Sequence, residues 1–287
     1  MKKHKICKIL LGILAIFLCV AFYELLGICV AYKKQPEVSN TTKKETKNGS
    51  WNECSENTER AVIIEKNPEA LLQRVRLIKN AKKEIILSTF AFQSDESGKL
   101  ILGALHDAAD RGVHIRLLVD GMESWIDMEG NPYFYGLSSH ENVEIKLYNK
   151  ANPLKPWKMM GRMHDKYLIA DGKRYILGGR NTYNYFLGDF PGHKNYDRDV
   201  LVVCDEPEKE NSVNQLLEYF ETIWEQEDSG YFHDNKKLAN RKSVKNAVLE
   251  LQNGYQKYFE ENKERICDTD YTDETFETEK IALVSNP

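Results

Sequence analysis

The stretch RMHDKYLIADGKRYILGGRN, residues 162–181, decides both the local fold and the chemistry of this chain. It places two short apolar runs on either side of an Asp171-Gly172 turn, a pattern typical of a hairpin-like pair of strands. Residues two apart on a strand point to the same face, so His164 and Lys166 are expected side by side. Burying an imidazole and an ammonium together without purpose would cost several kcal/mol. The pattern therefore indicates a functional site.

Further features of the same stretch suit a phosphate group. Asp171 follows at the turn, and we expect its carboxylate to orient and charge-balance the imidazole or the lysine. Gly178 and Gly179 end the second strand and are expected to leave backbone N–H groups open, while Asn181 adds an amide donor. H-x-K-x4-D alone is a weak motif, but G-G-x-N and the flanking strands strengthen it. Together they predict a phosphate site with His164 as nucleophile.

Outward from this stretch, apolar runs alternate with segments of helical periodicity. The predicted strands cover residues 61–64, 84–92, 113–119, 143–148, 166–170, 175–177 and 199–204, and the predicted helices cover residues 67–82, 97–111, 208–226 and 242–264. Asn67-Pro68 predicts a helix start, with asparagine as the N-cap. The alternation predicts an α/β sandwich with a mixed central sheet flanked by helices.

An apolar run occupies residues 9–32 and contains a single charge, Glu24. As a helix it would span roughly 36 Å, enough to cross a bilayer with tilt. A cleaved signal peptide is the alternative, but the run is long for that role and no small-x-small cleavage pattern follows. We predict a single-pass transmembrane anchor behind a basic N-terminus, residues 1–8. Its four lysines favour a cytoplasmic N-terminus and an extracytoplasmic domain at the cell membrane.

The remaining sequence divides into three parts. Residues 33–60 are polar and aperiodic and are predicted to be a flexible linker. Residues 61–265 carry the α/β pattern. Residues 266–287 are predicted to be a solvated acidic tail. An alternative comes from the end of this tail, because IALVSNP at 281–287 echoes VIIEKNP at 62–68, as the first strand of a truncated second lobe would.

Charge and cysteine usage exclude some classes of protein. Residues 1–34 carry six lysines and one acid, a net charge of +5, and the whole chain carries −4, so residues 35–287 carry −9. An acidic body argues against an extensive nucleic-acid surface. None of the cysteines lies in a C-x-x-C pair, so a zinc site is not expected. Cys54 and Cys267 flank the folded part and are candidates for a disulfide if the domain is external.

The pattern H-x-K-x4-D-x6-G-G-x-N resembles the HKD signature of the phospholipase D superfamily. It is similar in particular to the bacterial cardiolipin-synthase-like branch, which GGRN at 178–181, YF at 185–186 and DRDV at 197–200 also fit. Segments 92–98 and 108–121 agree, so the resemblance covers residues 61–205. There are two departures: Gly179 stands where serine is frequent, and the chain has one HKD copy.

The resemblance implies a phospholipase D-like fold and a set of roles. His164 would attack the phosphorus of a phosphodiester and form a phosphohistidine intermediate. Lys166 and Asn181 would bind the non-bridging oxygens and stabilise the charge of the transition state, and Asp171 would support the imidazole. Water as the acceptor gives hydrolysis, whereas a lipid hydroxyl gives phosphatidyl transfer. No metal or other cofactor is implied.

The resemblance also requires a second histidine, to protonate the leaving alcohol and then activate the acceptor. His193 is the nearest in sequence, and an exposed loop histidine is its simpler interpretation. Two sources remain. Two copies of the chain pair and each gives one His164, or the chain is the first lobe of a longer enzyme.

Three functions are therefore open. The leading hypothesis is a membrane-anchored enzyme that acts on phospholipids, similar to phospholipase D or cardiolipin synthase. The second is a membrane-tethered, homodimeric HKD nuclease, with nucleic acid as its partner. The third is a single, catalytically incomplete lobe.

The segment that leads into His164 adds one more ambiguity. It carries Lys150, Lys155, Lys158 and Arg162, which form either a rim that attracts anionic groups or a solvated loop. The apolar side chains at 157, 159 and 160 either dip into lipid or cover the core.

Overall fold

In the computed structural model, the described residues are 2–33, 40, 43–44, 59–207, 211–233, 235–278 and 281–284. The helices are α1 (Lys2–Lys33), α3 (Asn67–Asn80), α4 (Glu96–Asp110), α5 (Glu123–Asp127), α6 (Pro132–Ser138), η2 (Pro156–Lys158), α7 (Ser212–Trp224), η3 (Lys236–Asn240), α8 (Lys242–Glu261) and α9 (Lys263–Cys267). The strands are β1 (Glu59–Ile64), β2 (Glu84–Thr89), β3 (His114–Asp120), β4 (Val143–Tyr148), β5 (Tyr167–Ala170), β6 (Arg174–Gly178), β7 (Asp199–Val203), β8 (Ser229–Tyr231) and β9 (Phe276–Thr278).

The strands form one mixed sheet in the order β8-β4-β3-β2-β5-β6-β7-β1-β9. Strands β2, β3 and β4 run parallel, and the other neighbours pair antiparallel. Helix α4 connects β2 to β3, as parallel neighbours require a crossover. The predicted α/β class and mixed sheet are confirmed.

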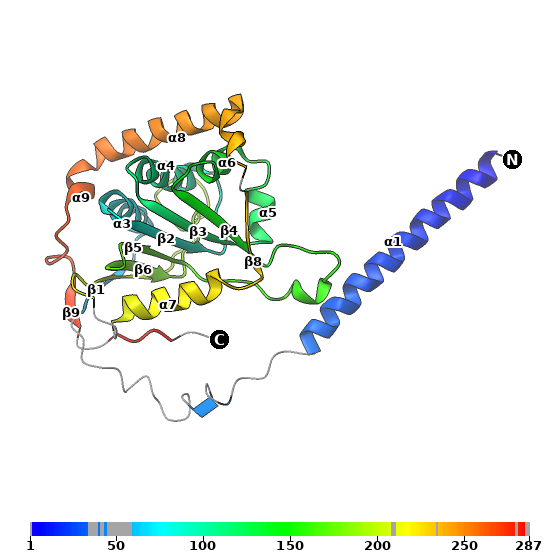
Figure 1. Ribbon diagram of the computed structural model, residues 1–287, viewed down its shortest axis with the longest axis horizontal. Helices are drawn as coiled ribbons and strands as arrows, with labels where there is room; N and C mark the ends of the chain where they lie inside the picture. The colour runs from blue at the N-terminus through cyan, green and yellow to red at the C-terminus, as the bar shows by residue number, and fades with distance from the viewer. Residues whose placement is uncertain are drawn as a thin grey trace.

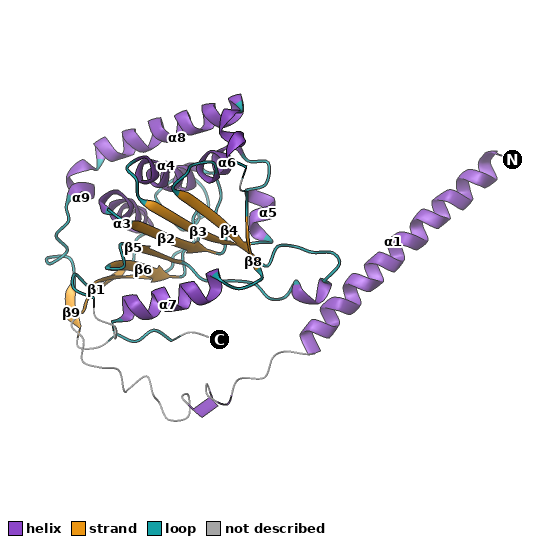
Figure 2. Cartoon of the chain, viewed as in Figure 1, coloured by secondary structure: helices purple, strands orange, loops and turns teal. Residues whose placement is uncertain are grey.

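Helices cover the two faces of the sheet unequally. Helices α3, α4, α6 and α8 lie over one face, whereas α7 lies over the other (Figures 1 and 2). The alternation of buried side chains follows this division: Ile85 and Leu87 of β2 belong to the larger core, and Ile86 to the smaller core under α7. The segment that contains His164 and Lys166, directly before β5, therefore borders the face of the sheet that α7 alone covers among these helices.

The predicted hairpin forms β5 and β6. Tyr167 pairs with Leu177, and Ala170 pairs with Arg174 at the turn. Three residues, 171–173, connect the two strands, and the Lys173 N–H donates to the Ala170 carbonyl. Asp171 and Gly172, at the centre of this turn, both have positive φ, 56° and 63°. This part of the sequence prediction is confirmed.

The predicted N-cap at Asn67 is wrong. Helix α3 already includes Asn67, and the capping position is Lys66, which makes no side-chain cap. The buried Asn67 amide instead donates to the carbonyls of Tyr185 and Asn195, while its oxygen accepts from Arg180 Nε. The asparagine thus fixes the loop that follows β6.

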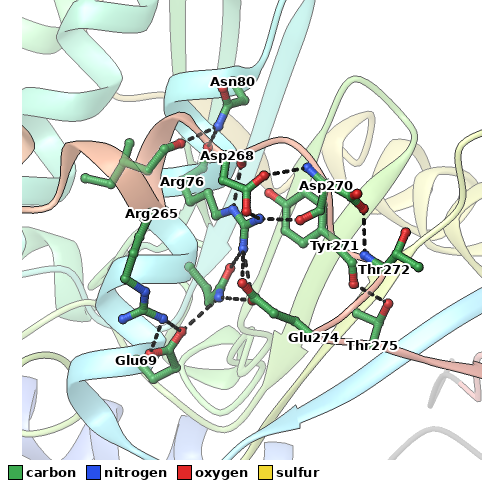
Figure 3. Close-up of polar contacts among 12 residues, drawn as sticks. Glu69, Arg76, Asn80, Arg265, Asp268, Asp270, Tyr271, Thr272, Glu274 and Thr275 are labelled. Atoms are coloured by element: carbon green, nitrogen blue, oxygen red, sulfur yellow. Dashed lines mark hydrogen bonds and ion pairs between the residues drawn. The ribbon is translucent and has the colours of Figure 1, made fainter.

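The prediction of a solvated acidic tail from residue 266 is also wrong. Arg76 of α3 is 1% exposed and donates to the carbonyls of Asp268 and Asp270 and to both carboxylate oxygens of Glu274 (Figure 3). Its guanidinium also stacks on the Tyr271 ring, 3.9 Å from the centroid. Strand β9 then pairs with β1. The acidic residues pair with arginines of the domain, which sequence alone did not indicate.

The end of the chain does not begin a second sheet in the described part. Residues 281–284 form no strand, and Ile281 and Leu283 pack against the smaller core. Leu283 N–H donates to Gln215 of α7. The disulfide expected between Cys54 and Cys267 involves a residue outside the described part, and Cys267 is exposed.

Among the described helices, α1 is long and apolar enough to cross a membrane, a property that a signal sequence near the N-terminus shares. Its large apolar side chains are exposed along its length.

Candidate active site

The candidate site lies where the carboxyl ends of β2, β3 and β4 meet the amino end of β5. This edge of an α/β sheet is the usual position for a ligand site, because loops there diverge and leave a crevice. A cleft of about 630 Å³ opens at this point. Its lining includes Tyr148, Arg162, Met163, His164, Asp165, Lys166, Tyr167, Leu177, Gly178, Leu216, Tyr219, Ile223, Gln226, Leu283 and Val284.

His164 and Lys166 meet on one aromatic ring. The His164 imidazole lies 4.7 Å from the Phe90 ring, centroid to centroid, and the Lys166 ammonium lies 5.5 Å from the same centroid. Both residues precede the first residue of β5, in an extended segment. The expected side-by-side placement of the two groups is present, and Phe90, which follows β2, forms its floor.

Asp120 fixes the segment that presents these groups. It ends β3 and is fully buried; its carboxylate accepts from the Met163 N–H at 3.1 Å and from Arg162 at 3.0 Å. Arg162 also donates to the Asn149 carbonyl. The residue directly before the imidazole is therefore held by a buried charge.

The electrostatics suit a neutral imidazole beside an anion-binding ammonium. Desolvation and then the Lys166 charge lower the pKa of His164, so the ring is neutral at pH 7. Burial likewise lowers the pKa of Lys166, although Asp165 and Asp197 oppose the shift. Lys166 as a whole is 5% exposed, and its ammonium donates to the His164 carbonyl at 2.5 Å. Among the described residues it forms no ion pair, and a buried cation of this kind favours an anionic ligand.

Asp165, which also lines the cleft, contacts helix α7. Its carboxylate accepts from the Tyr219 hydroxyl at 2.8 Å. Burial and then the Asp165 charge raise the pKa of Tyr219. This bond ties the site segment to α7, the helix that covers this face of the sheet.

Asp171 does not reach the imidazole or the lysine, so its predicted role is wrong. Its carboxylate accepts from the backbone N–H groups of Lys82, Lys83 and Glu84, at the start of β2. The whole of β5 separates Asp171 from His164. Asp171 is a structural residue that ties the hairpin turn to the neighbouring strand.

The expected open N–H groups at Gly178 and Gly179 are also absent. Gly178 donates to the Lys166 carbonyl, and Gly179 donates to the Arg198 carbonyl. A Cβ on Gly178 would lie 2.4 Å from the Arg198 carbonyl oxygen, and one on Gly179 would lie 2.0 Å from an Asp197 oxygen. The glycines are therefore required for close approach of the strand that follows, and their N–H groups belong to the sheet.

Asn181 lies beside the site floor. Its side-chain oxygen accepts from the Ala91 N–H, one residue past Phe90. The neighbouring Arg180 is fully buried and points away, pairing with Asp199 at 3.2 Å. The role of Asn181 as a phosphate ligand stays a proposal.

The other described histidines lie outside the cleft. His106 and His140 pair with Asp110, and His114 pairs with Glu144. His193 is exposed, and its ring lies 5.3 Å from that of Tyr185.

Three of the four basic side chains in the segment before His164 bond to other parts of the domain. Arg162 pairs with Asp120, Lys158 pairs with Asp228 at 2.6 Å, and Lys150 donates to the Tyr231 carbonyl. These contacts argue against a freely solvated loop, and the role of the segment as a rim that attracts anionic groups stays a prediction. In the part of the chain that the structure describes, no group of three or more His, Cys, Asp or Glu side chains is arranged to hold a metal ion.

Sequence reasoning assigned no role to Phe90 or Asp120. Phe90 follows β2 and Asp120 ends β3, two strands that run parallel, and the carboxyl ends of parallel strands meet at one edge of the sheet. The position of both residues at the ends of predicted parallel strands could therefore have identified them from the sequence.

Comparison with known proteins shows the family to which the chain belongs. Residues 74–224 match the family model described as "Cardiolipin synthase, PLD-like domain". The match covers just over half of the chain, which therefore belongs to this family of phospholipase D-like domains.

Curated relatives are similar over part of their length. An uncharacterized protein of Helicobacter pylori (strain J99) is 30% identical over 212 residues, which are 69% of this chain and 39% of that protein. Cardiolipin synthase C of Escherichia coli K12 is 29% identical over 171 residues, which are 55% of this chain and 34% of that enzyme. The chain thus spans about two fifths or less of the length of these relatives.

A solved structure has a similar fold. Phosphatidylserine synthase of Haemophilus influenzae Rd KW20 aligns with a TM-score of 0.50 and 17% identity, over 77% of this chain and 48% of that one.

Proposed function

We propose that the chain is a membrane-anchored phosphodiesterase or phosphatidyltransferase that acts on phospholipids through His164. The observation that supports this most is the pairing of a neutral, accessible imidazole with a buried ammonium on the Phe90 ring. A nucleophile beside a desolvated cation is the arrangement that attack on a phosphodiester requires. Relatives with the names cardiolipin synthase and phosphatidylserine synthase support a phospholipid substrate.

The proposed first step forms a bond between a ring nitrogen of His164 and the phosphorus. The phosphorus–oxygen bond to the leaving alcohol breaks, and that oxygen takes a proton from a general acid. Lys166 stabilises the charge on the non-bridging oxygens, and Asn181 adds an amide donor. In the second step a water or a lipid hydroxyl gives its proton back to the same group, which now acts as a base, and attacks the phosphorus, and the nitrogen–phosphorus bond breaks.

The general acid of this scheme comes from a second lobe. In the described part of the chain, no other histidine lines the cleft with His164. Either a second copy of the chain supplies its own His164 across a two-fold axis, or a further lobe does. Exposed apolar side chains near the site edge, among them Trp125, Ile126 and Tyr196, support coverage of this edge by another lobe.

Helix α1 is the proposed anchor. It would hold the site at the membrane that contains the substrate, with the lysine cluster at residues 2–8 on the cytoplasmic side and the domain outside.

The test uses the full chain in phosphatidylglycerol vesicles, with single-stranded DNA as a second substrate and His164→Ala as the control. We expect release of glycerol or formation of a new phospholipid, reduced by about a thousandfold or more in the variant. Mass photometry of the same sample gives the number of copies. Cleavage of DNA without lipid turnover would indicate a tethered nuclease, and a monomer without turnover would indicate an incomplete lobe.

A further inference from the structure

A second cleft lies between the last turn of α1 and the segment before the active site. Its volume is about 770 Å³. Val30 and Ala31 of α1 form one wall, and Trp157 and Met160 form the other. Its walls are mainly apolar side chains, unlike those of the active-site cleft, which holds an imidazole, an ammonium and a carboxylate.

Close contact between α1 and the 149–161 segment creates this cleft. The Tyr23 hydroxyl donates to the Leu154 carbonyl at 2.8 Å. A Cβ on Gly27 would lie 2.3 Å from Pro156 Cγ, so glycine allows the helix backbone to meet the loop directly. Figure 1 shows the short helix η2 beside the end of α1.

In a bilayer the contact would start near the membrane boundary, at the end of α1, and extend roughly 14 Å along the helix to Tyr23, into the outer hydrocarbon region. The apolar run of α1 is roughly 36 Å long, a little more than the ~30 Å hydrocarbon core, so its last turns reach the head-group region. Leu154, Trp157 and Met160 are 77%, 46% and 58% exposed. Such exposure suits a lipid environment better than water.

The two clefts adjoin at Tyr148, which lines both. Gly161 lines the apolar cleft, and Arg162 and Met163, the next residues along the chain, line the active-site cleft. A molecule with a phosphate beside His164 would therefore extend an attached chain past Tyr148 toward α1.

We propose that the apolar cleft binds an acyl chain of the phospholipid whose phosphate reacts at His164. The proposal rests on the proposed function, and it adds that the anchor helix is part of the substrate-binding site. Substrate would then enter from the membrane side, between α1 and the 149–161 segment.

The test compares two substitutions in that segment, in the full chain in vesicles. Met160→Trp fills the cleft, whereas Leu154→Trp adds similar bulk to an exposed position outside it. Turnover is measured on dioleoyl phosphatidylglycerol and on bis(4-nitrophenyl) phosphate, which has no acyl chain.

We expect Met160→Trp to lower kcat/KM on the lipid about tenfold, the effect of losing the contacts of roughly two methylene groups. The same variant should turn over bis(4-nitrophenyl) phosphate within about twofold of the parent. Leu154→Trp should stay within about twofold of the parent on both substrates. Equal loss on both substrates, or no loss on the lipid, would overturn the proposal.

A binding measurement separates this proposal from the proposed function. The fluorescence of Trp157 is obtained by subtracting the signal of Trp157→Phe from that of the parent. Phosphatidylglycerol that is brominated on its acyl chains should quench this Trp157 fluorescence. Val30→Phe, which fills the cleft from α1, should reduce that quenching by about half or more. If the parent turns over neither substrate, the proposed function fails, and unchanged quenching in Val30→Phe overturns the acyl-chain site on its own.

Discussion

The His164 imidazole packs against the Phe90 ring at 4.7 Å between centroids and at an interplanar angle of 60°. The tilted contact shields one side of the imidazole and leaves the residue exposed on the other. Burial is also the largest cause that lowers the pKa of His164. One aromatic side chain thus affects both the orientation and the protonation of the proposed nucleophile.

Phe90→Ala should therefore raise the pKa of His164 toward its ordinary value of about 6.5 and lower kcat about tenfold. Phe90→Leu keeps an apolar wall and should have a smaller effect on both. NMR titration of the His164 ring gives the pKa, and a shift that is the same in both variants would argue against the ring contact.

Lys166→Met should raise the pKa of His164 as well, because the ammonium is the second cause of its depression. The acidic limb of the pH profile of kcat/KM, where the imidazole becomes protonated, should then move to higher pH. Loss of the cation should also reduce kcat about a hundredfold or more. If the variant keeps full activity and the acidic limb of its pH profile stays at the same pH, Lys166 is not part of the site.

Asp171→Ala should destabilise the domain by about 1–3 kcal/mol, because its carboxylate accepts three backbone N–H groups at the start of β2. The pKa of His164 should not change, since the two residues lie at opposite ends of β5. Asp171→Asn retains one acceptor oxygen and should be less destabilised. Urea denaturation with NMR of the imidazole checks both statements, and a pKa shift without loss of stability would restore the original assignment.

The two glycines before Arg180 should respond differently to alanine. A Cβ at Gly178 meets the Arg198 carbonyl oxygen at 2.4 Å and the Asp199 Cα at 2.7 Å, which only a backbone shift relieves. Gly178→Ala should cost about 3 kcal/mol. At Gly179 the obstacle is the Asp197 carboxylate, a side chain able to rotate, and the cost should be about 1 kcal/mol.

Gly254→Ala is the matched control for these variants, because an added Cβ there meets nothing within 4 Å. In the middle of α8 it should stabilise the domain by up to about 1 kcal/mol. Equal destabilisation in Gly178→Ala and Gly179→Ala would contradict the distinction between backbone and side-chain obstacles.

Much of the framework follows from local sequence patterns. The β5–β6 hairpin depends on Asp171-Gly172, whose positive φ values form the centre of the turn, and the strands follow their apolar alternation. The juxtaposition of His164 and Lys166 follows from the two-residue period of an extended chain. These features need no knowledge of distant contacts.

The errors concern partners that are far apart in sequence. The Asp171 carboxylate bonds to residues 82–84, and the N–H of Gly179 bonds to Arg198. Both contacts depend on strand order, which places β5 beside β2 and β6 beside β7. A local pattern gives the type of a side chain and its direction, but not the strand that it meets.

The fold-back of the C-terminal segment gives a further prediction. Arg76→Met removes a 1%-exposed guanidinium that binds Glu274 and two carbonyls, at a cost of about 3 kcal/mol. Amide hydrogen exchange of residues 268–278 should accelerate more than that of β2 and β3. Arg76→Lys keeps the charge without the planar fork and should be intermediate. Unchanged protection of residues 268–278 would show that other contacts hold the segment.

The central claim is that the His164 ring nitrogen bonds covalently to the phosphorus of a phospholipid. The direct measurement mixes the full chain with short-chain phosphatidylglycerol, quenches within milliseconds at neutral pH, and analyses peptides by mass spectrometry. A phosphatidyl adduct on the peptide that contains His164, present in the parent and absent in His164→Asn, is the predicted result. Two results would contradict the account: lipid turnover by the parent without any adduct, or a rate of lipid turnover in His164→Asn that equals that of the parent.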